Sequence, residues 1–179
     1  MPSMTLLRVS DMPRLIGVQV PLDTYVVLTA PAPLVGMSFP NPGRWEALTK
    51  LGVKHVVCLT DAVAPYDPTP LRVSASCCLT DLFGEQYPAD PEAEEATIRV
   101  LSANVSNLLS ACEGVVVHCV GGTGRTGTVI GCTLIQLGYS ADEVVGYLDM
   151  LTRKRRGRGW PESPWQEDVI RRLAQRGNI

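Results

Sequence analysis

The sequence predicts an α/β protein built around a central sheet. Short apolar, β-branched runs alternate with longer segments of helical periodicity, and glycine or proline marks most of the boundaries between them. The 179 residues are 45% hydrophobic, which is enough to form a core. We expect a single domain covering 1–179, because compact domains commonly contain about 100–200 residues and no repeat or low-complexity linker interrupts the chain.

Five short apolar runs are typical of strands. The first two are separated by a turn at Pro21, and the second leads into a proline-rich stretch, 30–43, which is expected to be irregular surface chain. The run VVVHC is the most apolar of the five and is expected to be buried. The predicted strands are 15–20, 25–30, 54–60, 71–80 and 115–119.

Five longer segments have apolar residues at helical spacing. The clearest begins with Pro91 in its first turn, carries acidic residues near its N-terminus and is broken by Gly114 after its predicted end at Cys112. Gly52 is a plausible C-cap for the first helix, and Ser163, ahead of Pro164, is a plausible N-cap for the last. The predicted helices are 44–52, 91–112, 126–138, 141–154 and 163–176.

The charge of the chain bears on which kinds of partner it can bind. Sixteen basic and 18 acidic residues give a net charge of −2, which argues against a protein that grips the nucleic-acid backbone. The basic residues within 153–158 are interpreted first as a solvated helix end, and second as charges that steer an acidic ligand. The chain has no apolar run of about 18 residues and no secretory signal at its start, so we expect a cytoplasmic protein without membrane insertion. Nothing in the sequence indicates an oligomeric state.

The turn after the strand 115–119 carries the strongest functional signal. Residues 118–127 read HCVGGTGRTG and lead into a predicted helix. Glycines let the backbone curl so that successive N–H groups point inward, and the helix adds its positive end. The turn therefore predicts an anion cradle with the Cys119 sulfur at its floor. The predicted substrate-binding residues are Val120, Gly121, Gly122, Thr123, Gly124 and Arg125.

The same turn predicts a reactive sulfur. A cysteine at a helix N-terminus beside a guanidinium favours the thiolate, so Cys119 is the expected nucleophile. Arg125 offers a planar fork to two phosphate oxygens. The hydroxyl of Thr126 is placed to stabilise the thiolate when it leaves, and His118 is expected to orient the loop rather than act as a base.

This loop resembles the signature loop of the cysteine-dependent protein tyrosine phosphatase superfamily. The segment KLGVKHVVCLTD at 50–61 is similar to an early strand of the compact dual-specificity branch, and the resemblance extends over most of the chain from about residue 44. It implies a four- to five-stranded mixed sheet flanked by helices. It also implies hydrolysis of phosphate monoesters through a phosphocysteine intermediate, with no metal or cofactor. The implied partner is a phosphorylated protein or peptide, carrying phosphotyrosine and also phosphoserine or phosphothreonine.

The resemblance further implies an aspartic acid upstream of the cysteine that protonates the leaving group. Asp81 is favoured because it ends a predicted strand and opens the loop DLFGEQYP. Asp90 is the alternative, although an acid just ahead of a helix is an ordinary dipole-compensating residue. Asp61 is a third candidate. In the tyrosine-specific and lipid-directed branches a glutamine positions the hydrolytic water, and Gln166 lies at the matching place.

Several alternatives stay open. The cradle could belong to a phosphoresidue-binding module without turnover, to a sulfur- or arsenate-handling enzyme, or to a phosphatase for a non-protein ester such as a phosphoinositide. The absence of lysine from the loop lowers the odds of a phosphoinositide substrate. Trp160 and Trp165 are interpreted as packing residues. The thiols are expected to be reduced, and the further cysteines Cys77, Cys78 and Cys112 are interpreted as buried hydrophobes, or one of them as a resolving thiol for Cys119.

Overall fold

The computed structural model describes residues 24–41 and 43–176. Its Cα positions separate into two compact units, the first comprising the chain up to Cys78 together with Asn107–Gly122, and the second Leu79–Ser106 together with the chain from Thr123. The expectation of a single domain over 1–179 stays a prediction. The strand expected at 15–20 lies outside the described residues. In the described part of the chain, no helix is long and apolar enough to cross a membrane.

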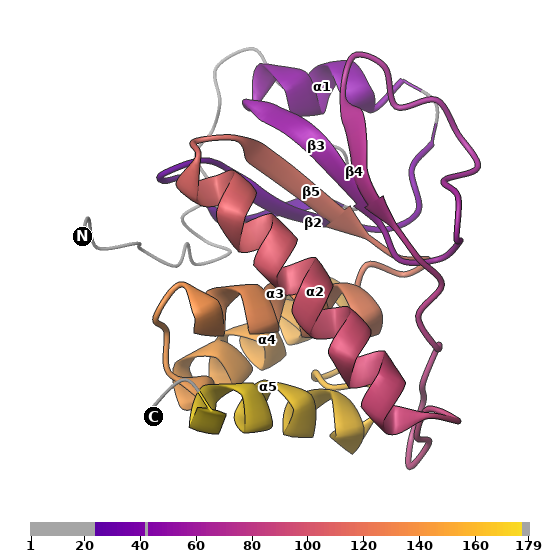
Figure 1. Ribbon diagram of the computed structural model, residues 1–179, viewed down its shortest axis with the longest axis vertical. Coiled ribbons are helices and arrows are strands. Elements are labelled where there is room, and N and C mark those ends of the chain that lie inside the picture. The colour runs from indigo at the N-terminus through magenta and orange to yellow at the C-terminus, as the bar shows by residue number, and fades with distance from the viewer. Residues whose placement is uncertain (1–23, 42, 177–179) are drawn as a thin grey trace. The chain divides into compact units, whose positions relative to one another are not determined.

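A five-stranded mixed sheet forms the first unit. Its strands lie side by side in the order β1-β2-β5-β3-β4 (Figure 1). β1 is antiparallel to β2, and the other neighbours are parallel. The sheet confirms the expected α/β class and the expected strand number. The strands are β1 Thr24–Leu28, β2 Leu34–Met37, β3 Val53–Cys58, β4 Arg72–Ser76 and β5 Gly114–His118.

The expectation of irregular chain throughout 30–43 is wrong, because β2 occupies its middle. The four residues of β2 are all buried, and they lie between β1 on one side and β5 on the other. The prolines of this stretch flank the strand instead of interrupting it, so the N–H groups of the strand remain available for pairing.

One face of the sheet is covered by α1 (Trp45–Lys50), which packs beside β3 (Figure 1). Trp45 and Leu48 of this helix enter a core cluster with side chains from the strands, including Val56 and Val116. Gly52 follows the helix with φ 90°, as expected of a glycine that ends a helix. Two fully buried valines flank Val116 on β5, so the strand that leads into the predicted loop is rigidly packed.

The helix α2 (Pro91–Ser110) ends at Ser110, short of the predicted end at Cys112. Cys112 takes the left-handed conformation with φ 60°, and the Glu113 N–H donates to the Leu108 carbonyl over 2.9 Å. Gly114 is instead the first residue of β5. A Cβ there would lie 2.3 Å from the carbonyl oxygen of Gly52, so the glycine is needed where two chain segments approach closely.

The second unit contains three further helices, which follow the predicted segments closely. They are α3 Gly124–Gln136, α4 Ala141–Arg156 and α5 Pro164–Arg176. α3 packs against both α4 and α5. α4 begins with a capping box between Ser140 and Glu143 and ends at Gly157, whose φ is 70°. Residues 124–134 of α3 are all buried, so this helix is the centre of its unit.

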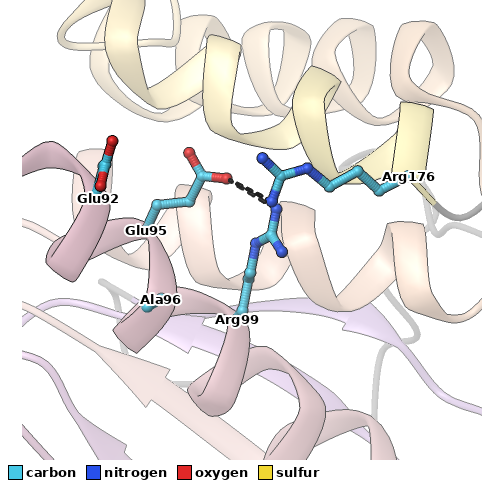
Figure 2. Close-up of a pocket in the computed structure, with 5 residues that line it drawn as sticks. All are labelled: Glu92, Glu95, Ala96, Arg99 and Arg176. Carbon is cyan, nitrogen blue, oxygen red and sulfur yellow. Dashed lines mark hydrogen bonds and ion pairs between the residues drawn. The ribbon is translucent and has the colours of Figure 1, made fainter.

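A cluster of ion pairs joins the first half of α2 to α5. Glu95, whose side chain is 13% exposed, accepts from Arg99 at 2.9 Å and from Arg172 at 2.8 Å, and lies 3.8 Å from Arg176. Glu95 and Arg176 point towards each other in Figure 2, and both line a pocket of about 270 Å³. The cavity is lined by Glu92, Glu95, Ala96, Arg99 and Arg176, and none of these residues belongs to the loop 118–127.

We expect Gly36→Ala to destabilise the protein. A Cβ at Gly36 would lie 2.1–2.5 Å from ring atoms of Tyr25, and a rigid aromatic ring has little freedom to yield. Overpacking of this kind costs about 1–3 kcal/mol of unfolding free energy, which urea denaturation measures. Gly146→Ala is the matched control, because Gly146 faces open space in a helix and the change should be neutral or stabilising by up to about 1 kcal/mol. Equal stability of the two variants would contradict this account.

Candidate active site

The first part of the loop follows directly from β5. Cys119 is 3% exposed, and its sulfur accepts the N–H of Gly122 over 3.2 Å. Gly122 has φ 66°, and a Cβ there would lie 2.5 Å from the main chain of Met37, so only glycine fits this bend. The bend thus directs at least one main-chain donor at the sulfur, as expected of a loop that stabilises a thiolate.

Contacts from the sheet hold the outer side of this bend. The N–H of Phe39 donates to the Val120 carbonyl over 2.9 Å, and the hydroxyl of Tyr25 donates to the Gly122 carbonyl over 3.1 Å. The side chain of Val120 is exposed. Two carbonyl groups of the bend are therefore bound by residues of the first unit, while the Gly122 N–H is directed at the sulfur.

The second part of the loop opens α3. Thr123 precedes the helix, with φ −122° and ψ −80°, and Arg125 lies in its first turn. Arg125 is 7% exposed, and its Nη2 lies 2.9 Å from Oδ2 of Asp81, while Nη1 donates to the Leu79 carbonyl over 3.4 Å. The Nε of Arg125 is buried and has no partner in the described part of the chain. The guanidinium is thus held in place by two contacts, and its Nε–H remains without a partner among the described residues.

Of the three candidate acids, Asp81 pairs with the arginine of the loop. The carboxylate of Asp90 accepts the Ala93 N–H over 3.0 Å, at the start of α2, which is the ordinary helix-start role. Asp61 accepts the hydroxyl of Thr60 over 2.5 Å. The half-exposed Asp81 carboxylate is the one in contact with both solvent and Arg125.

A carboxylate that the sequence analysis missed also reaches the loop. Oε2 of Glu162 accepts the N–H of Gly124 over 2.9 Å, and its other oxygen accepts from Arg158 over 2.5 Å. Glu162 lies in the turn between α4 and α5, and its side chain is only 9% exposed. The sequence indication for Glu162 is its position four residues ahead of Gln166, which is predicted to position the hydrolytic water.

Gln166 lies beside the same part of the loop. It is buried, and its Nε2 lies 2.7 Å from where a Cβ of Gly124 would be. Its Oε1 accepts the N–H groups of Glu162 and Ser163 over 2.9 and 3.3 Å. The hydroxyl of Ser163 donates to the Gln86 carbonyl over 2.6 Å and so ties the segment that follows Asp81 to the start of α5. The side chain of Gln166 thus shares in capping the helix.

Three more residues named in the sequence analysis are buried, namely Thr126 in α3, Trp160 after α4 and Trp165 in α5. Thr126 is fully buried, and its hydroxyl has no hydrogen-bond partner among residues 24–41 and 43–176. Trp160 and Trp165 are both buried, and a Cβ at Gly127 would lie 2.5 Å from Nε1 of Trp160. The burial of both tryptophans agrees with their interpretation as packing residues, and Trp160 lies against the first turn of α3.

The first unit also contains a group of interacting polar side chains that the sequence did not indicate. Nε2 of His118 hydrogen-bonds the hydroxyl of Tyr66, and the sulfur of Cys58 lies 3.4 Å from Oγ1 of Thr60. Burial opposes ionisation of the Cys58 thiol, but hydrogen bonds with His118 and Thr60 outweigh it and lower the pKa to about 6. Burial, together with Cys58, raises the pKa of Tyr66. The parallel register that pairs Cys58 with His118 brings the group together.

The remaining cysteines divide by exposure. Cys78 and Cys112 are exposed, so their interpretation as buried hydrophobes is wrong, whereas Cys77 is partly buried. Cys58, Cys119 and Cys132 are buried. Burial raises the pKa of Cys132 to about 12, so this thiol is inert at neutral pH.

Comparison with known proteins identifies the class of domain. The family described as "Swiss Army Knife protein, DSP-PTPase phosphatase domain" matches residues 24–158. The chain therefore belongs to this family of dual-specificity-type protein tyrosine phosphatase domains, and the resemblance inferred from the loop is confirmed.

Individual relatives agree with this family. Protein tyrosine phosphatase type IVA 3 of Mus musculus is 30% identical over 112 residues, which cover 63% of this chain and 61% of the length of that relative. The structure of Tk-PTP in its active form superposes with a TM-score of 0.60 at 20% identity, covering 80% of this chain and 92% of the other. The human tyrosine phosphatase-like serine/threonine/tyrosine-interacting protein gives a TM-score of 0.63 at 13% identity, with 82% and 93% covered. The two structures establish the shared fold.

The low pKa of Cys58 predicts how stability varies with pH. The folded protein holds the thiolate above about pH 6, whereas the unfolded chain holds the thiol up to about pH 9. Unfolding therefore takes up a proton in this interval, so the free energy of unfolding should rise with pH by up to about 1.4 kcal/mol per unit. The contribution is complete above pH 9 and is lost as the pH falls through 6. Urea denaturation of the wild type and Cys58→Ser measures it, and parallel pH profiles of the two proteins would refute it.

Proposed function

We propose that this protein hydrolyses phosphate monoesters of phosphotyrosine, and also of phosphoserine and phosphothreonine, in proteins or peptides. The observation that carries the proposal is the loop HCVGGTGRTG, in which the Gly122 N–H donates to the Cys119 sulfur and a carboxylate lies against the buried Arg125. Membership of the phosphatase family supports the same reaction. The proposal includes a cytoplasmic location, since an ionised catalytic thiol requires a reducing compartment.

In the first step, the thiolate of Cys119 attacks phosphorus. A sulfur–phosphorus bond forms, the bond to the ester oxygen breaks, and Asp81 in its protonated form gives its proton to the leaving oxygen. Two groups hold the equatorial oxygens, namely the N–H groups of residues 120–125 and the guanidinium of Arg125. The unpartnered Nε of Arg125 supports this role, because one more donor of that fork is available to a phosphoryl oxygen.

In the second step, water attacks the phosphorus of the phosphocysteine. Asp81, now a carboxylate, takes the proton of the water while the sulfur–phosphorus bond breaks and Cys119 leaves as a thiolate. Gln166 positions the water, and its place beside Gly124 supports this assignment. Thr126 stabilises the leaving thiolate, and its buried, unpartnered hydroxyl is free to donate a hydrogen bond. None of these roles calls for a metal or another cofactor.

We expect the protein to hydrolyse p-nitrophenyl phosphate at undiminished rate in the presence of EDTA. Cys119→Ser should abolish turnover, because the hydroxyl is not ionised at neutral pH, while tungstate binding measured by calorimetry persists. Loss of activity on chelation would contradict the absence of a metal. Turnover by Cys119→Ser would contradict the nucleophile.

Asp81→Asn should slow hydrolysis most for substrates whose leaving group is a poor one. A positioned general acid contributes about 10²–10⁴-fold, and that contribution shrinks when the departing oxygen needs little protonation. Rates for a series of aryl phosphates with graded phenol acidity measure the difference. Asp90→Asn is the matched control and should leave the series unchanged. If Asp90→Asn slows the reaction and Asp81→Asn does not, the acid has been assigned to the wrong residue.

A further inference from the structure

Two donors in the second part of the loop are held by carboxylates of the protein itself. The N–H of Gly124 is bound by Glu162 over 2.9 Å, and Nη2 of Arg125 is bound by Asp81 over 2.9 Å. A carboxylate oxygen resembles a phosphoryl oxygen in charge and in its need for N–H donors. Asp81 is the proposed general acid, whereas the Glu162 carboxylate that binds Gly124 has no role in the proposed reaction.

The carboxylate of Glu162 is held in place rather than free on the surface. Its main-chain N–H donates to Gln166, and the next residue, Ser163, is anchored to the Gln86 carbonyl. The side chain is 9% exposed, and its second oxygen accepts from Arg158, which is 60% exposed. Glu162 therefore has a partly buried contact with the loop on one side and an exposed cation on the other.

The N–H of Gly124 can serve one strong acceptor at a time. It belongs to the set of loop donors that, on the proposed function, hold the oxygens of the phosphoryl group. A phosphate dianion entering this loop meets a donor that is already occupied and a negative charge beside it, both of which oppose binding.

We propose that Glu162 is an internal competitor for the phosphate group, an inference that rests on the proposed function. Its carboxylate takes the place of one phosphoryl oxygen on Gly124 in the anion-free protein, and the incoming group moves it towards Arg158. Glu162 thus sets the affinity of the site for phosphate-like dianions and favours release of the phosphate product. If the Glu162 carboxylate only supported the conformation of the loop, it would raise the affinity for dianions instead of lowering it.

The test is the affinity for tungstate, measured by calorimetry on the 179-residue chain. Glu162→Gln should bind tungstate about five- to tenfold more tightly than the wild type, because the variant removes the competing charge. Glu167→Gln is the matched control: it removes the same charge from a residue paired with Arg171 on α5, and should change affinity less than twofold. Unchanged or weaker binding by Glu162→Gln overturns the proposal.

A second measurement requires no variant. In wild-type protein labelled with ¹³C at glutamate carboxyl groups, saturating tungstate should shift the resonance of Glu162 and leave that of Glu167 in place. A Glu162 resonance that does not move while tungstate binds also overturns the proposal. Failure of the proposed function has a different signature, namely no hydrolysis of p-nitrophenyl phosphate and no binding of tungstate by the wild type.

Discussion

Main-chain N–H groups of the loop that begins at Cys119 require acceptors, and this requirement shapes the site. A buried donor without an acceptor costs about 1–3 kcal/mol. Gly122 donates to the Cys119 sulfur, and Gly124 donates to the carboxylate of Glu162. The two acceptors are thus the sulfur of a cysteine and an oxygen of a carboxylate. These two donors are satisfied within the protein, so they do not need a bound ligand as their acceptor.

The sheet imposes the other constraint. β5 is the middle strand, and its valines have no contact with solvent, so the position at which the chain leaves the sheet at Cys119 is fixed. β2 lies next to it, and the main chain of Met37 approaches Gly122 so closely that a side chain there would clash. The conformation of the loop is therefore fixed by packing against β2 as well as by its own glycines.

Periodic and local features of this chain could be predicted from the sequence. α4 and α5 were found because apolar residues repeat at helical spacing, and the loop was found because its residues are consecutive. β2 was missed because four residues are too few to show alternation and the surrounding prolines suggested loop structure. Glu162 and Tyr66 were missed because each reaches its partner across a long stretch of chain, and no periodicity records such a contact.

For the acidic residues, too, the roles that depend on local sequence position could be predicted, whereas long-range contacts could not. Asp81 was favoured because it follows a strand, a local argument, and the ion pair with Arg125 agrees with it. The helix-start role of Asp90 was likewise visible in sequence, since an acid ahead of a helix commonly caps it. The hydrogen bond from Ser163 to the Gln86 carbonyl could not be predicted from the sequence, because a serine near a helix start is equally well explained as a cap.

The ion-pair cluster around Glu95 determines how well the second unit would tolerate truncation of α5. Two of its cations, Arg172 and Arg176, belong to the last turns of α5, whereas the carboxylate they neutralise lies on α2. Trimming the chain ahead of Arg172 would remove those two cations and leave Arg99 as the remaining partner of a nearly buried charge. The cost of such a deletion would fall on α2, a helix far away in the sequence, although the arginines that are lost are themselves largely exposed.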